Sequence, residues 1–125
     1  MEQATPGILM TPRLKAEIWV AAYLRTVRLH GGFAYLVRRG AEEAGSILLK
    51  VEAPGGTATV YSPGYMDGVR TWLRSSGPQP VPATEADSYI QRRLATDPDL
   101  WVVEVEDRAG RHFLTEPVEG EETDP

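Results

Sequence analysis

The amino-acid sequence predicts a single α+β domain with a largely antiparallel sheet of about six strands and two helices packed on it. Its 125 residues suffice for one domain that buries about two thirds of its unfolded surface. Two stretches have apolar residues at helical spacing, and six shorter runs rich in branched or aromatic residues lie between turn signals. Short turns favour an antiparallel meander with both helices on one face, although the connection through the second helix could create a parallel pair.

The first helix is expected to begin at Pro12, capped by Thr11, and to end at Gly31-Gly32. Residues 1–11 lack periodicity and are expected to form a flexible arm. The helix has one apolar face with i, i+3, i+4, i+7 spacing, formed by Ala16, Trp19, Val20, Tyr23, Leu24 and Val27. Its opposite side combines apolar and charged residues, so a dimer contact through this helix is an alternative.

Four strands are expected to follow, over residues 33–38, 46–52, 57–61 and 69–74. Pro54-Gly55-Gly56 joins the second and third strands as a hairpin, and Ser62-Pro63-Gly64 is expected to end the third. In the fourth, Arg70, Trp72 and Arg74 share one face. The proline-rich residues 75–82 then form a surface connection.

The second helix is expected to begin at a capping box formed by Thr84 and Asp87 and to end at Asp97-Pro98. Its apolar stripe consists of Ala86, Tyr89, Ile90 and Leu94. A closing hairpin is expected from strands 101–106 and 111–115, which together with the helix makes residues 12–115 the folded domain. Residues 116–125 are expected to form a disordered acidic tail.

Composition excludes several classes of protein. The chain has no cysteine, which excludes disulfides and thiol catalysis, and it has neither a secretory signal nor an apolar run that spans a bilayer. A cytoplasmic location is therefore expected. The net charge of −5 comes from the five acids of residues 116–125; the rest has 13 acids and 13 bases, without the basic excess of a dedicated nucleic-acid binder.

The first candidate site is the Arg70, Trp72 and Arg74 face, where an aromatic ring between two guanidinium groups suits RNA. The alternative is that Trp72 packs under the second helix while the arginines extend into solvent. A second candidate is an anion clamp or a surface for an acidic protein, made from Arg38, Arg39, Arg92 and Arg93. Paired arginines are more often solvated or bound to nearby acids.

Two further candidates involve acids. Tyr65 and Asp67 are placed to line a pocket, although the same loop also suits a plain turn. Glu104 and Glu106, two residues apart on a strand, suit acid–base chemistry or a hard metal together with His112. The expected hairpin places Glu106 opposite Arg111 and turns His112 away, which argues against this site. We therefore expect no catalytic residues, no metal and no cofactor.

Four segments carry a family resemblance: Arg13-Leu14-Lys15-Ala16-Glu17-Ile18-Trp19-Val20, Arg38-Arg39-Gly40, Gly45-Ser46-Ile47-Leu48-Leu49-Lys50 and Asp97-Pro98-Asp99-Leu100-Trp101-Val102-Val103-Glu104. With them the chain resembles the bacterial family called domain of unknown function 1491 over residues 13–115. The resemblance implies an α-proteobacterial source and assigns no role to any residue.

The favoured interpretation is a non-catalytic binding or regulatory module for a protein or RNA partner, using the arginine-bearing surfaces. One alternative is a small ligand-binding domain or enzyme with a pocket near Tyr65, Asp67 and Trp72. Another is a structural homodimer built on the first helix.

Overall fold

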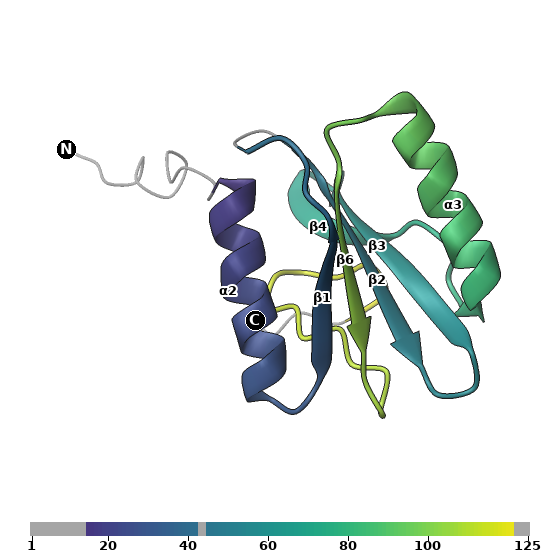
Figure 1. Ribbon diagram of the computed structural model, residues 1–125. Helices are drawn as coiled ribbons and strands as arrows, with labels where there is room; N and C mark the ends of the chain where they lie inside the picture. The colour runs from purple at the N-terminus through teal and green to yellow at the C-terminus, as the bar shows by residue number, and fades with distance from the viewer. Residues whose placement is uncertain (1–14, 43–44, 122–125) are drawn as a thin grey trace.

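The computed structural model describes residues 15–42 and 45–121 (Figure 1). The elements, in chain order, are α2 (Ala16–Leu29), β1 (Phe33–Arg38), β2 (Ile47–Ala53), β3 (Thr57–Met66), β4 (Val69–Arg74), β5 (Val81–Pro82), α3 (Ala83–Thr96) and β6 (Trp101–Glu106). This arrangement confirms the predicted α+β domain with two helices on a six-stranded, mostly antiparallel sheet. Among the described residues no helix is both long and apolar enough to cross a membrane.

The strand order is β1-β6-β2-β3-β4, and the short β5 pairs with β3. Strand β6 is inserted between β1 and β2, antiparallel to β1 and parallel to β2. The parallel pair arises because α3 carries the chain back over the sheet before β6 enters it, as the sequence allowed.

The two helices cover opposite faces of the sheet (Figure 1). The expectation that both helices pack on one face is therefore wrong. The central strands are apolar on both sides: Leu49 and Val103 pack beneath α2, whereas Leu48 and Val102 pack beneath α3. A strand that is apolar on both sides must be covered on both faces, and one helix serves each face.

The helices match their predicted apolar faces. Helix α2 buries Ala16, Val20, Tyr23 and Val27 and ends before Gly31, whose φ of 92° suits glycine. The expected start at Thr11 and Pro12 and the arm over residues 1–11 lie outside the described residues. Helix α3 begins at Ala83 with Pro82 at the N-cap and without a side-chain cap, so the predicted capping box is wrong.

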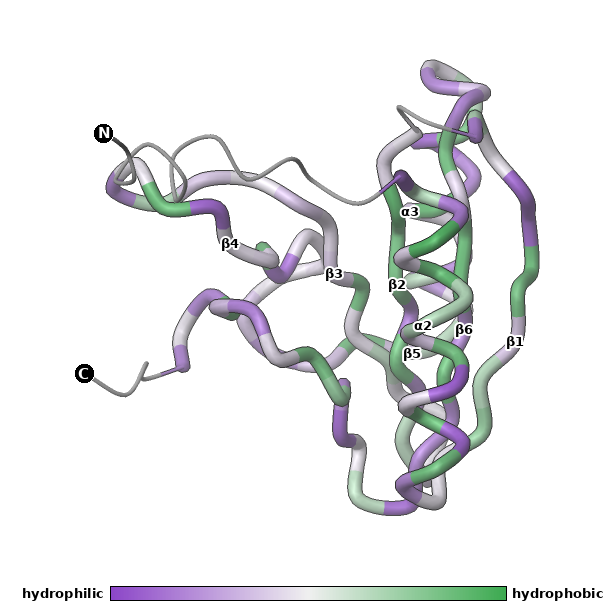
Figure 2. Tube along the Cα trace, turned by 90° about the vertical axis from the view of Figure 1, so that its left-hand side faces the viewer, coloured by the Kyte–Doolittle hydropathy of each residue, from purple (hydrophilic) through white to green (hydrophobic). Residues whose placement is uncertain are grey.

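Strand β3 is longer than expected and continues through Pro63 and Gly64 to Met66. A two-residue turn then leads into β4, with φ values of 51° at Asp67 and 78° at Gly68. Positive φ at both positions is the signature of the type I′ hairpin turn. The end of this hairpin projects from the body of the sheet (Figure 2).

The predicted closing hairpin does not form, because Asp107 turns the chain out of the sheet. Its carboxylate accepts hydrogen bonds from the backbone N–H groups of Ala109 (3.1 Å) and Arg111 (2.8 Å) and from the Arg111 guanidinium. Residues 111–115 consequently form no strand. They begin a segment that crosses the α2 side of the sheet, which we call the C-terminal strap (residues 111–121).

The strap continues along β4, although residues 116–125 were expected to be disordered. Trp72 donates its backbone N–H to Pro117 (2.9 Å) and accepts from the N–H of Glu119 (2.8 Å), and Val118 is buried. Pairing with the free edge of β4, burial of Val118 and hydrogen bonds to the carboxylates of Glu116 and Glu119 thus hold residues 116–121 against the sheet. Residues 122–125 lie outside the described part of the chain.

Candidate functional site

Part of one face of the sheet has no element over it among the described residues. Helix α2 packs on β1 and β6 from one side, and the strap covers Tyr61 and Trp72 on that same side. On the other side α3 contacts β2, β3 and β5. The side of β1 and of the end of β6 that faces away from α2 is left uncovered.

We call this surface the open face, formed by Phe33, Tyr35, Glu52, Glu104 and Glu106. Phe33 lies opposite Glu106 and Tyr35 lies opposite Glu104 in the antiparallel register. The intervening Ala34 is buried beneath α2, so its two neighbours point to the opposite side. Phe33 is 64% exposed and Tyr35 47% exposed, which is unusual for two aromatic residues on the same strand face.

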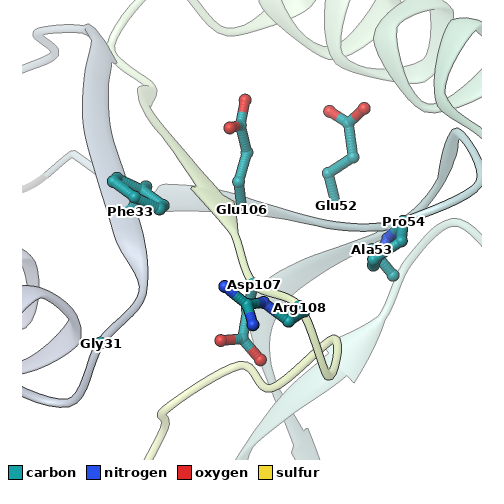
Figure 3. Close-up of a pocket in the computed structure, with 8 residues that line it drawn as sticks. All are labelled: Gly31, Phe33, Glu52, Ala53, Pro54, Glu106, Asp107 and Arg108. Carbon is teal, nitrogen blue, oxygen red and sulfur yellow. The ribbon is translucent and has the colours of Figure 1, made fainter.

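The acidic side chains form a row beside these aromatic rings. Glu52 is the neighbour of Glu106 in the parallel β2–β6 register, and Figure 3 shows both side chains projecting to the side on which α3 lies. One carboxylate oxygen from each of Glu52, Glu104 and Glu106 lies within 4.8 Å of the other two. Next to them is a hollow of about 420 Å³ lined by Gly31, Phe33, Glu52, Ala53, Pro54, Glu106, Asp107 and Arg108 (Figure 3).

Lys50 is buried between this acidic row and α3. Its Nζ lies 2.7 Å from Asp87 Oδ1, 3.3 Å from Glu104 Oε2 and 3.6 Å from Glu52 Oε1. Burial opposes its charge, but the hydrogen bond to Asp87 and the attraction of Glu104 outweigh burial and raise the pKa of Lys50. One ammonium therefore faces three carboxylates. Glu106 adds a further negative charge beside them, so the open face keeps an excess of negative charge.

The three glutamates are the described residues best placed to hold a metal ion. Clustered carboxylates suit a hard cation such as Ca²⁺ or Mg²⁺. Lys50 already places a positive charge beside Glu52 and Glu104. In its observed position the ammonium provides much of the neutralisation that a bound cation would supply.

The predicted Arg70, Trp72 and Arg74 surface is not continuous. Trp72 is 6% exposed, with its ring centroid 5.2 Å from that of Trp19 and its Nε1 donating to Glu116 (3.3 Å). Trp72 packs against α2. The alternative prediction, that Trp72 packs under the second helix, is therefore wrong. Arg74 pairs with Glu121 of the strap (3.2 Å), and Arg70 alone of the three is exposed.

The other predicted arginines bind groups within their own neighbourhood. Arg38 donates to the Pro98 carbonyl (2.8 Å), whereas Arg39 pairs with Glu17 and lies over the Trp101 ring. Arg92 and Arg93 both lie over the ring of Tyr89. Among the described residues no hydrogen bond or ion pair brings the two arginine pairs to a common partner.

Tyr65 and Asp67 lie near the end of the β3–β4 hairpin, where Asp67 forms the turn and Tyr65 is 64% exposed. The buried Trp72 lies on the α2 side of the sheet. The hollow described above is lined by other residues.

His112 is separated from the glutamates, as predicted, but for a different reason. It lies in the strap, where Nε2 contacts Glu121 (3.0 Å) and Nδ1 accepts from the Leu114 N–H (2.9 Å). Arg111, the expected partner of Glu106, binds Asp107 instead. Glu106 is thus free to join Glu52, which sequence reasoning missed because the parallel register of β2 and β6 is set only by the tertiary fold.

Comparison with known proteins places the chain in a family. The model of the family described as "Protein of unknown function (DUF1491)" matches residues 14–115. The chain belongs to the DUF1491 family. The sequence-based resemblance is confirmed.

Solved structures of this family share the fold. A DUF1491 protein from Caulobacter crescentus CB15 is 45% identical in its crystal structure, with a TM-score of 0.77 over 86% of this chain and 100% of that one. An NMR structure of a DUF1491 protein from the same organism is 44% identical, with a TM-score of 0.75 over 86% of this chain and 97% of that one. Protein Atu0922 from A. tumefaciens is 29% identical, with a TM-score of 0.73 over 89% of this chain and 100% of that one. No protein with a curated description matches the sequence.

Proposed function

We propose that this DUF1491 protein is a non-catalytic cytoplasmic module that binds a protein partner through the open face. The observation that carries the proposal is the juxtaposition of two exposed aromatic side chains with a row of carboxylates on a part of the sheet that no described element covers. Aromatic residues that stay exposed on a regular strand are typical of interaction surfaces, and adjacent charges provide orientation and specificity.

The charge of the open face favours a protein over RNA. Glu52, Glu104 and Glu106 would repel a phosphate backbone at the surface where the aromatic rings are exposed. The ring of Trp72, the residue predicted to stack on a base, is buried and bonded to Glu116. A protein segment with apolar and basic side chains complements the open face better.

The test is site-specific photo-crosslinking in the native host. Tyr35 is replaced by the photoreactive benzoylphenylalanine, which preserves an aromatic ring at the centre of the open face. Tyr65 provides the matched control, because it is an exposed tyrosine on a strand far from the open face in the fold. We expect crosslinking at position 35 to yield one discrete protein adduct that position 65 does not yield, and Phe33→Ser and Glu106→Lys to reduce it.

Other outcomes overturn the proposal. Equal adducts from both positions would show non-specific contact. An adduct that is sensitive to ribonuclease would indicate RNA, and an adduct of the chain with itself would indicate a homodimer. The absence of any adduct at position 35, with the Tyr65 control equally silent, would remove the open face as a binding surface.

A further inference from the structure

We infer that the partner element that covers the open face is an amphipathic α-helix with an apolar stripe and a basic stripe side by side. This inference rests on the proposed function and adds the conformation and chemistry of the partner. Three features of the molecule support it: the space beside α3, the two chemically different strips of the open face and the hydrogen bonding of the β1 edge.

The space beside α3 has the width of a helix. Helix α3 lies over β2, β3 and Val102 near the start of β6, and the uncovered end of β6 and the strand β1 come next in the sheet. Strands lie about 4.8 Å apart, so two strand spacings amount to roughly 10 Å. The axes of packed helices are separated by about 8–10 Å, which is close to that value. A helix over β6 and β1 would therefore pack beside α3 and complete the layer.

The strand lengths set the length of the partner helix. Strand β1 has 6 residues, which corresponds to about 20 Å. A helix rises about 1.5 Å per residue, so about 13 residues would span the strand. Helix α3, which covers the neighbouring strands, has 14 residues.

The chemistry of the open face is divided along its length. Phe33 and Tyr35 form an apolar strip on β1, and the carboxylates form a parallel strip on β6 and β2. A helix that lies along the strands would present a stripe of apolar residues to β1 and a stripe of Lys or Arg to the carboxylates. Burial of the aromatic rings would supply affinity, and the paired charges would set the orientation.

The outer edge of β1 is less suited to a partner that adds a strand. The Ala34 carbonyl oxygen already accepts a hydrogen bond from the Arg28 guanidinium (2.8 Å). The pairing of β1 also shifts register between Leu36 and Arg38, a bulge of the kind that blunts sheet edges. These two features favour a partner on the face over a partner on the edge.

The experiment titrates three designed peptides of about 18 residues against the full-length, isotope-labelled protein and follows its amide resonances. The first is an amphipathic helix with adjacent Leu and Lys stripes. The second has Glu in place of every Lys, and the third alternates Val and Lys with flanking prolines and is extended. We expect the basic helix to shift the resonances of Phe33, Tyr35, Glu104 and Glu106 and to bind at least about tenfold more tightly than either of the others.

A variant pair isolates the charge. Glu106→Lys reverses one charge on the open face without removing a partner of Lys50, and Glu85→Lys makes the same change on the exposed first turn of α3. We expect Glu106→Lys to weaken the basic helix about tenfold, and Glu85→Lys to leave it within about twofold. Circular dichroism of the bound peptide should show an increase in helix.

Three results would overturn the inference: equal binding of the basic and acidic helices, preference for the extended peptide, or resonance shifts confined to surfaces other than the open face. A selective crosslink at position 35 combined with any of them would leave the proposed function standing and remove only the helical partner. Loss of the crosslink as well would remove both.

Discussion

The two halves of the sheet differ in how they are covered. The half that contains β2 and β3 has α3 on one side and the strap, which covers Tyr61, on the other. Its central residues Leu48, Leu49 and Val60 are fully buried. The half that contains β1 and the end of β6 has only α2. The sequence of β6 reflects this difference. On the α3 side of β6, the buried Val102 is followed by the charged Glu104 and Glu106.

Polar and aromatic side chains have different surroundings on the two halves of the sheet. On the covered half, polar groups complete the structure: Glu116 accepts from the indole N–H groups of both Trp19 and Trp72, and Glu119 accepts from the Arg74 backbone. On the uncovered half, Phe33 and Tyr35 are exposed although their burial would be favourable. Exposed aromatic surface of this kind adds nothing to the stability of the isolated chain, and the proposed partner would account for it.

The largest expected effect is on the covered half, at Trp72. Trp72→Ala removes a buried ring that packs against Trp19 and lies beneath the strap, and we expect it to lower the free energy of unfolding by about 3–5 kcal/mol. Urea denaturation followed by circular dichroism measures the change. A loss below about 1 kcal/mol would show that the strap does not close the core at this point.

The next effect is expected at Lys50, at the boundary between the two halves. Lys50→Met leaves Glu52, Asp87 and Glu104 without their shared cation, and we expect a loss of about 2 kcal/mol in the free energy of unfolding at neutral pH. The loss should shrink in the double variant with Glu104→Gln, because one of the repelling charges is gone. Equal losses in the single and double variants would show that Lys50 acts through its packing and not through its charge.

A smaller, pH-dependent effect is expected at Asp107, where the chain leaves the sheet. The hydrogen bonds from the Arg111 side chain lower the pKa of Asp107 to about 2, against 3.8 for a free carboxyl group. The unfolded chain therefore takes up this proton at higher pH than the folded chain does. The stabilisation by Asp107 is present above about pH 4 and is lost as the pH falls towards 2.

Asp107→Asn tests this account through the pH dependence of unfolding. The variant should be less stable than the wild type at neutral pH, and the difference should diminish between about pH 4 and pH 2. Urea denaturation at a series of pH values measures it. A difference that does not change over this range would show that the carboxylate charge is not what fixes the turn.

The smallest expected effect on stability is on the uncovered half. Tyr35→Ser should change the free energy of unfolding by no more than about 0.5 kcal/mol, because the ring is half exposed and has no covering element among the described residues. Thermal unfolding with Tyr65→Ser as the matched control checks this. A loss above about 1 kcal/mol would indicate that the open face is covered in the free protein.

Local patterns predicted most of the elements correctly. The apolar faces of both helices and the strands over residues 33–38 and 69–74 agree with the structure, because helical and strand periodicities are properties of neighbouring residues. Pro63 and Gly64 suggested an end to β3, yet both lie within it opposite Trp72 and Thr71 of β4. Strand β2 pairs with β3 only as far as Tyr61, so β3 has a free side at Pro63, where a proline is tolerated. A turn signal and such a residue cannot be distinguished without knowing where the neighbouring strand ends.

The errors near the C-terminus have a local cause. Asp107 to Gly110 suits a hairpin turn, but the Asp107 carboxylate binds the backbone and side chain of Arg111 and directs the chain across the sheet. The strap is then held by contacts with residues far away in the sequence, such as Trp72 and Arg74. Composition alone could not reveal them, since five acids in ten residues are typical of a solvated tail.

The sequence by itself determined the class of the fold, the family, and the presence of two glutamates at positions 104 and 106 on one strand face. Only the tertiary structure decided that β6 lies between β1 and β2, and this insertion brings Glu52 beside Glu106 and Phe33 opposite it. The physical reason is that periodicity describes which side of a strand is apolar, whereas the neighbour on each side is chosen by the burial of the whole sheet. The open face is a product of that choice.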